Sequence, residues 1–325
     1  MENKITRQIY ASGGLSPYEN LAIEKHLMAN LEQGEVILFL WRNADTIVIG
    51  RNQNVWQECR VSEFLEDGGR IARRLSGGGA VYHDVGNLNF SFIYSEGAWS
   101  TEKGLEVIAD ACRRFGIDAQ VSGRNDILAD GAKFSGNAFF SLTGNKGVKA
   151  ICHHGCILIS ANTDRLSKFL TVSKAKLESK GVRSVKSRVV NLGNLSADVS
   201  VDSFSDSLAA SFDNGIPVRP VTINGEIEKD TEFFASDEWL FGRKIAFTHS
   251  FGQRFSWGEI SLGFRVSGGT VEECKVFSDS MNEALAPFIE KAFVGNPFSY
   301  EALSKALGED IPEADDIKDL IFKNV

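Results

Sequence analysis

Hydrophobic positions repeat with helical or strand periods along most of the chain. Ser16–Glu19 form a capping box with proline at the first helical position, which predicts a helix over Pro17–Leu31. Two apolar runs follow, Val36–Trp41 and Thr46–Gly50, and the turn residues between them predict a hairpin. Because both runs are apolar on both faces, we expect a sheet that is covered on two sides.

The middle of the chain is dominated by strand patterns. Asn87–Tyr94 alternates with a period of two, so we expect the glycines before it to lie between paired strands of one sheet. Gly131–Phe140 and Val148–Ile159 flank a turn and predict an antiparallel pair. Helices are few and grouped, with candidates at Val61–Glu66 and from Ser100 to Gly116. This grouping favours an α+β fold over a doubly wound parallel sheet.

A helix is predicted at Val201–Phe212, and an irregular stretch follows it. Near Lys244 the strand and helix periods of hydrophobic residues begin again. A second hairpin is expected around Ser267–Thr270, followed by three helices at Glu283–Ala292, Tyr300–Leu307 and Ala314–Phe322. We therefore expect a larger first domain over residues 1–243 and a small α+β second domain over residues 244–325.

Composition narrows the class of protein. With 43% hydrophobic and 24% charged residues, the 325-residue chain resembles an ordinary globular protein, and no apolar run approaches the roughly 20 residues that span a bilayer. The formal net charge of −8 argues against a nucleic-acid partner. The first residues contain no targeting signal, so we expect a cytoplasmic protein without a membrane partner. Five scattered cysteines indicate neither a disulfide framework nor a zinc site.

The stretch from Arg73 to Asp84 carries the clearest chemical signal. Three consecutive glycines expose backbone N–H groups, and Arg73 and Arg74 place fixed positive charge at the loop entrance. A plain glycine-rich turn is the alternative. The flanking charged and aromatic residues favour a loop that binds an anion.

Lysine provides the second signal. Lys133 lies among small and apolar residues of a predicted strand, where an anionic substrate or a carboxylate would compensate its charge. Lys174–Arg188 is a basic stretch with one acid, which is typical of a solvated helix face or of a loop that orders over phosphate. Walker, zincin, nucleophile-elbow and Rossmann motifs are absent from the sequence. A nucleotide site and a simple anion site both fit these residues.

Five ordered motifs give the chain a family resemblance. Arg73–Asn87, Gly123–Asp126, Lys133–Ala138, His153–Gly155 and Lys180–Val189 closely resemble the corresponding segments of the lipoate–protein ligase A family. The resemblance covers nearly the whole chain. It implies a biotin/lipoate ligase-type mixed-sheet α+β catalytic domain followed by a small α+β accessory domain.

The resemblance also implies a reaction and its residues. Lipoate and ATP with Mg²⁺ would give lipoyl-AMP, which then acylates a lysine on a lipoyl domain of a 2-oxoacid dehydrogenase E2 subunit or on the glycine cleavage H protein. Lys133 would be catalytic and would contact both ligands. Further lipoate-binding positions are Arg73, Ser76, Gly77, Gly78 and His154. ATP or adenylate positions are Arg74, Gly79, Ala80, Val81, Tyr82, Asn125, Asp126, Lys180, Arg183 and Ser184. The ligands of the metal are not indicated.

One residue departs from the family pattern. Cys156 follows the His-His-Gly motif where relatives often carry threonine, and related octanoyltransferases use a cysteine nucleophile without ATP. A buried structural thiol is the interpretation we favour, because no neighbouring base is evident in the sequence. A binding protein without catalytic activity, specific for the adenylate or lipoate, is the third alternative.

Overall fold

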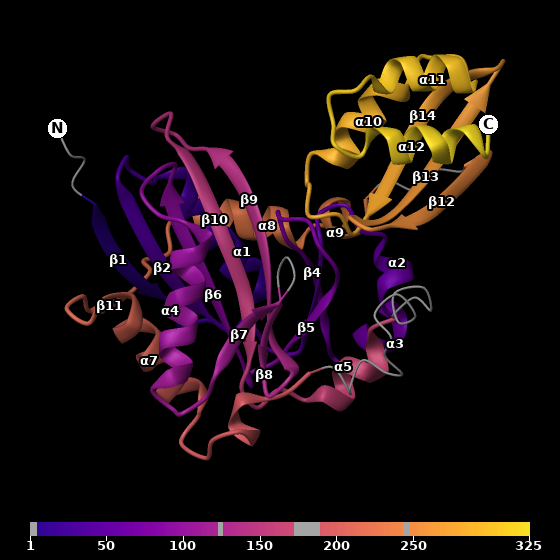
Figure 1. The fold of residues 1–325 in the computed structure, drawn as a ribbon. Coiled ribbons are helices and arrows are strands. Elements are labelled where there is room, and N and C mark those ends of the chain that lie inside the picture. The colour runs from indigo at the N-terminus through magenta and orange to yellow at the C-terminus, as the bar shows by residue number, and fades with distance from the viewer. Residues whose placement is uncertain (1–4, 123–125, 172–188, 243–246) are drawn as a thin grey trace.

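The computed structural model describes residues 5–122, 126–171, 189–242 and 247–325. It confirms the α+β class: a large unit and a small unit are built around separate hydrophobic cores (Figure 1). The predicted domain boundary at residues 243 and 244 falls outside the described residues and stays a prediction. Within the described residues, no helix combines the length and apolarity that crossing a membrane requires.

An eight-stranded mixed sheet forms the centre of the large unit, in the order β11-β1-β2-β6-β10-β9-β8-β7. The strands β11, β1 and β2 are parallel, and the pairs from β2 to β7 are antiparallel. Their bounds are β1 Thr6–Ala11, β2 Glu35–Trp41, β6 Asn87–Ser95, β7 Ala119–Ser122, β8 Asp126–Ala129, β9 Ala132–Thr143, β10 Lys149–Leu158 and β11 Val218–Pro220. The expected antiparallel pair is β9 with β10, so that prediction is confirmed.

Helices cover both faces of this sheet, as the apolar run Val36–Trp41 in β2 predicted. On one face α4 (Thr101–Arg113) and α7 (Val201–Asp213) lie side by side and enclose the largest core (Figure 1). Serine side chains at Ser100 and Ser200 cap the two helices. On the other face lies α1 (Pro17–Ala29), which packs against Phe39 and its neighbours.

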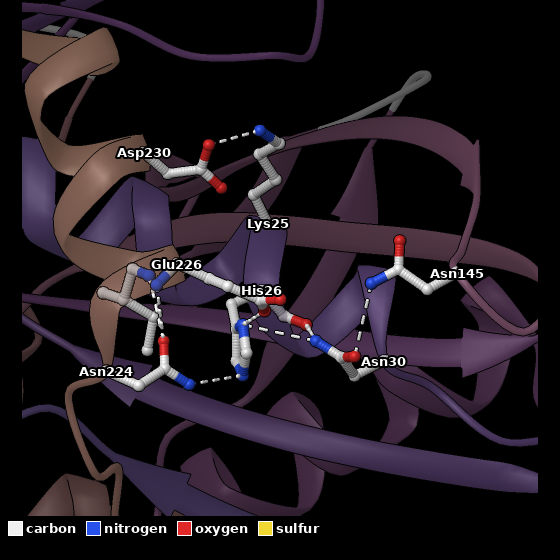
Figure 2. A network of polar contacts seen from close by, with 8 residues as sticks. Lys25, His26, Asn30, Asn145, Asn224, Glu226 and Asp230 are labelled. Carbon is white, nitrogen blue, oxygen red and sulfur yellow. Dashed lines mark hydrogen bonds and ion pairs between the residues drawn. The ribbon is translucent and has the colours of Figure 1, made fainter.

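Polar contacts hold α8 (Gly225–Ala235) against α1. Figure 2 shows Lys25 Nζ paired with Asp230 Oδ1 at 2.5 Å and His26 Nδ1 at 3.2 Å from Glu226 Oε2. Asn145, in the turn between β9 and β10, donates to Asn30 Oδ1 at 3.4 Å. These contacts are partly exposed, so the apolar surface between the helices stabilises their packing more than the ion pairs do.

A second, three-stranded sheet has the order β4-β3-β5, with β3 Thr46–Ile49, β4 Arg70–Arg73 and β5 Val81–His83. The hairpin predicted from Val36–Trp41 and Thr46–Gly50 is therefore wrong. Both edges of β2 are already paired, with β1 and β6, so β3 pairs with β4 and β5 instead. The glycine loop joins β4 to β5, which both flank β3 and do not pair with each other. Its expected position between paired strands is also wrong.

Short helices surround the small sheet: α2 (Val55–Glu58), α3 (Val61–Glu66), α5 (Thr163–Phe169) and α9 (Asp237–Phe241). Phe64 and Phe169 pack in its core with tilted rings, at a centroid distance of 4.9 Å. A 3-10 turn at Leu192–Asn194 follows soon after the described chain resumes at Val189.

The accessory unit is an antiparallel sheet, β12 (His249–Phe255), β13 (Gly258–Ser267) and β14 (Thr270–Ser278), covered by α10 (Leu285–Phe293), α11 (Tyr300–Leu307) and α12 (Ala314–Phe322). The hairpin of β13 and β14 confirms the prediction, and Gly268 and Gly269 both take the positive φ that its turn requires. Ile260, Leu262 and Phe264 alternate along β13 and form its buried face.

Candidate active site

Lys133 lies at the start of β9, on the sheet face that α1 covers. Its Nζ is 2.7 Å from Asp126 Oδ1, and a Cβ added to Gly136 would lie 2.8 Å from the same Nζ. The lysine therefore folds back over Gly136, which must lack a side chain for this conformation. With 31% of its side chain exposed, Lys133 is less buried than the strand pattern suggested. Asp126 is the carboxylate partner that the buried-lysine argument required.

Arg74 shapes the glycine loop from inside. Its guanidinium donates to the carbonyls of Gly77 at 2.6 Å and Gly79 at 2.8 Å, and its Nε donates to Ser76 Oγ at 3.0 Å. Burial lowers the pKa of Arg74 to about 10, so the side chain stays charged at neutral pH. Because the loop carbonyls turn toward this cation, the loop keeps a fixed shape around Gly78, whose φ is +85°.

One amide of the loop is occupied by the accessory unit. The N–H of Gly78 donates to the carbonyl of Ser280 at 3.0 Å, and a Cβ added to Gly77 would lie 2.3 Å from that same oxygen. Asn52 contacts the same segment, through its carbonyl to the N–H of Ser278 and through its Nδ2 to the carbonyl of Glu283. The glycine loop therefore serves as a docking surface for the residues that follow β14.

Arg73 points away from Arg74, as neighbouring residues of a strand do. Its guanidinium donates to five backbone carbonyls, those of Gly50, Arg51, Gln53, Trp239 and Leu240. Burial lowers its pKa to about 10. These contacts tie α9 and the loop after β3 to β4, so the two adjacent arginines have different environments.

A buried hydrogen-bond chain connects α1 with the glycine loop. His154 Nε2 lies 2.7 Å from Ser76 Oγ, and its Nδ1 lies 2.8 Å from Glu24 Oε1. Ser91 donates to the same carboxylate at 2.5 Å. Burial alone would raise the pKa of Glu24, but the His154 charge and these hydrogen bonds outweigh it and the pKa is lowered. His154 is thereby held in one orientation beneath the loop.

Glu24, Cys152 and His154 are the described residues that come closest to a metal-ligand set, with ligand atoms within 4.8 Å of one another. Burial and the Glu24 carboxylate raise the pKa of Cys152 well above its ordinary value, so the thiol keeps its proton. Hydrogen bonds link the Glu24 carboxylate to this thiol and to His154 Nδ1. The cluster therefore stabilises the fold as a network of hydrogen bonds.

His153 faces the other side of the sheet, which confirms that only one histidine of the pair is directed to this site. Its ring stacks on Phe139 at 4.6 Å between centroids, and its Nε2 lies 2.8 Å from Asn137 Oδ1. Burial lowers its pKa to about 3. His153 is thus a neutral residue of the fold.

Comparison with known proteins identifies the family. Residues 16–213 match the model of the lipoyl protein ligase A/B catalytic domain, and residues 244–320 match that of the bacterial lipoate protein ligase C-terminus. The chain belongs to the lipoate–protein ligase A family. A relative of that name from Bdellovibrio bacteriovorus is 33% identical over 313 residues, covering 92% of this chain and 91% of its own. The protein is therefore an enzyme of the ligase class.

Solved structures agree with this assignment. LipL1 of P. falciparum in complex with lipoate aligns with a TM-score of 0.86 at 28% identity, covering 98% of this chain and all of its own. A lipoate–protein ligase A bound with ATP gives a TM-score of 0.60 at 25% identity over 74% and 99% of the two chains. A bipartite lipoate protein ligase of Thermoplasma acidophilum, described with its E2 lipoyl domain, gives 0.61 at 27% identity over 75% and 99%.

Several of the site residues expected from the sequence lie around Arg74 and the glycine loop. Ser76, Gly77, Gly79 and His154 meet around Arg74. Ala80, Val81 and Tyr82 continue into β5, and the Tyr82 side chain turns into the small-sheet core, where its hydroxyl donates to Asp45 at 2.9 Å. Burial raises the pKa of Tyr82, so its side chain is a neutral packing group.

Four expected positions, Asn125, Lys180, Arg183 and Ser184, lie outside the described residues, as does the whole basic stretch Lys174–Arg188. The described chain resumes at Val189, which pairs with Lys133, and the N–H of Val190 donates to the Lys133 carbonyl at 2.9 Å. Val189 and Val190 therefore lie directly beside Lys133, although they are far from it in sequence.

Cys156 lies between Asn89 and Gly136 in the sheet. Burial raises the pKa of its thiol, although Lys133 and Arg74 act in the opposite direction. Cys156 is therefore a protonated thiol in this environment and lacks the thiolate character of a nucleophile.

Three buried polar residues of this region were not among the predicted site residues. Glu24 orients His154, as described above. His83 is buried, and burial and Arg74 lower its pKa to about 3. Its Nε2 has no hydrogen-bond partner among the described residues, and the same is true of both side-chain polar atoms of Asn89. Because each residue fits a helix or strand pattern, only the tertiary structure shows that these polar groups converge.

Proposed function

We propose that this ligase activates lipoate with ATP and transfers the lipoyl group to a lysine of a lipoyl domain. In the first step, a lipoate carboxylate oxygen attacks the α-phosphorus of ATP, and the bond to pyrophosphate breaks. In the second step, the lysine amine attacks the acyl carbon, AMP leaves, and the amine loses a proton. The observation that carries this proposal is the position of Lys133, whose ammonium lies over Gly136 and whose backbone pairs with Val189.

Lys133 would act in both steps through its charge. Negative charge develops on the carboxyl and phosphate oxygens in each transition state, and a fixed ammonium stabilises it. Asp126 holds the ammonium in place before the substrates bind. Arg74 would act on the loop rather than on a phosphate, because it already contacts the loop carbonyls. The backbone of Gly77 to Tyr82 would then receive ATP.

The remaining residue assignments belong to the same proposal. Ser76, Gly77, Gly78 and His154 would be directed to lipoate, and of these Ser76 and His154 are linked by the hydrogen bond described above. Arg73 would support the lipoate site indirectly, because its guanidinium already donates to five backbone carbonyls. Asn125, Lys180, Arg183 and Ser184 would complete the adenylate site. Residues 1–243 would form the catalytic domain and residues 244–325 the accessory domain.

Mg²⁺ and the acceptor are also part of the proposal. Asp126 offers the hard oxygen ligands that Mg²⁺ prefers, and the ion would neutralise phosphate charge. E2 lipoyl domains and the glycine cleavage H protein are the proposed acceptors, a choice supported by the T. acidophilum ligase and its E2 lipoyl domain. We place the reaction in the cytoplasm, because ATP is supplied there.

The test is pyrophosphate release that requires both lipoate and ATP, followed by a mass increase of an isolated E2 lipoyl domain. A lipoyl domain whose acceptor lysine is replaced by arginine is the control and should gain no mass. Octanoyl transfer from acyl carrier protein without ATP, abolished by Cys156→Ser, would instead identify a transferase. Tight lipoate binding without turnover on any lipoyl domain would identify a binding protein.

A further inference from the structure

Asn89 is a buried amide that the reaction described above does not use. The residue is 0% exposed, and neither Nδ2 nor Oδ1 has a hydrogen-bond partner among the described residues. An unpaired buried amide is costly, and native proteins keep few of them. A ligand that binds next to the amide would remove this cost.

The register of the sheet places Asn89 on the surface that carries Lys133. Asn89 pairs with Trp41 on β2 and with Cys156 on β10, and Cys156 pairs with Gly136 on β9. Residues paired directly across strands share one face of a sheet. Since the Lys133 ammonium lies over Gly136, the lysine, the thiol, the amide and the indole form one row on that face.

Distance along this row decides which part of a substrate reaches Asn89. Two strand spacings separate Gly136 from Asn89, which is roughly 10 Å. A carboxylate held at Lys133 is therefore too far away to bond the amide. An acyl chain that extends from Lys133 across β10 would bring its distal end to Asn89, where Trp41 continues the row.

Two other polar side chains near this end, Ser91 and His154, are already engaged. Ser91 donates to Glu24 Oε1 and accepts from Trp41 Nε1 at 3.1 Å. His154 is bonded at both ring nitrogens. Asn89 Nδ2 is therefore an unused N–H donor on this row, whereas His83 Nε2, which also has no partner among the described residues, belongs to β5 of the small sheet.

We infer that Asn89 determines specificity for the dithiolane ring of lipoate by donating its amide N–H to a ring sulfur. This inference rests on the proposed function. A disulfide sulfur is a weak acceptor, but it is the polar group that lipoate carries at its distal end. Octanoate has the same chain length and no sulfur, so it would leave the buried amide unpaired. A site built around a hydrogen bond discriminates against the analogue that lacks the bonding group.

Asn89→Leu tests the inference because leucine keeps a similar volume and removes the amide. We expect the ratio of kcat/KM for lipoate to that for octanoate, measured by pyrophosphate release, to fall roughly tenfold. The fall should come from lipoate, with octanoate turnover unchanged or improved. Asn137→Leu is the matched control: it removes a buried asparagine from β9 that contacts His153 on the opposite face, and it should leave the ratio unchanged.

A substrate series tests the same point in the unmodified enzyme, without dependence on the folding of a variant. Octanoate analogues that carry a single sulfur, at the position of one or the other ring sulfur of lipoate, should have a higher kcat/KM than octanoate. If the enzyme uses these single-sulfur analogues no better than octanoate, the inference is wrong. It is also wrong if the kcat/KM ratio of Asn89→Leu equals that of the unmodified enzyme. Either result would leave the proposed function intact. If neither lipoate nor octanoate releases pyrophosphate, the proposed function fails, and the inference fails with it.

Discussion

Replacement of Lys133 by methionine separates catalysis from stability. The side chain is partly exposed, and its ion pair with Asp126 is 2.7 Å long. Partly exposed ion pairs contribute about 0.2–1 kcal/mol, so the free energy of unfolding should change by less than about 1 kcal/mol. A charged group directed at developing negative charge contributes far more, and its loss should lower adenylation about 10²- to 10³-fold.

The assay is lipoate-dependent pyrophosphate release, with urea unfolding of the same preparation as the measure of stability. Lys149→Met is the matched control: Lys149 lies on β10 and its Nζ pairs with Glu96 Oε1 at 2.7 Å, on the exposed part of the strand. The control should lose a similar small amount of stability and keep its turnover. Turnover of Lys133→Met within a few-fold of the unmodified enzyme would show that this lysine does not act on the reacting groups.

Three further substitutions test the surroundings of the site. Gly136→Ala places a Cβ 2.8 Å from Lys133 Nζ, so pyrophosphate release should fall roughly 10- to 100-fold because the lysine is displaced, while the urea midpoint stays close to that of the unmodified protein. Arg74→Met leaves loop carbonyls without donors and should lower the free energy of unfolding by about 3 kcal/mol and weaken ATP binding in a titration; normal values for both would contradict its role in the loop. His153 has a pKa of about 3 in the fold against an ordinary value of 6.5, so the unfolded chain binds a proton that the folded chain does not as the pH falls below 6.5. The contribution of neutral His153 to the free energy of unfolding is present above that pH and should decline by about 2 kcal/mol between pH 7 and pH 5, as measured by urea unfolding. His153→Gln should reduce this decline, and exposed His249→Gln should not.

Local sequence signals were sufficient for elements whose ends and partners are close in the chain. Helix α1 begins at Pro17 as predicted, although the Ser16 side chain makes no capping hydrogen bond and the predicted capping box is therefore not formed. The turn between β9 and β10 joins strands that pair directly. The predicted helix of the Val201 segment is likewise present as α7. The glycine loop and Lys133 could be recognised as site candidates from their residue types, because glycine and isolated lysine are unusual in strand surroundings.

Tertiary structure decided the pairing of strands and the partners of buried polar groups. Val36–Trp41 and Thr46–Gly50 carry good hairpin signals, but β1 and β6 occupy the edges of β2, and strand pairing depends on which edges are free. Arg73 and Arg74 are adjacent and chemically identical, yet one holds α9 and the other holds the glycine loop. Periodicity tells which face a side chain occupies, whereas a hydrogen bond or an unpaired amide depends on groups that only the folded chain brings together.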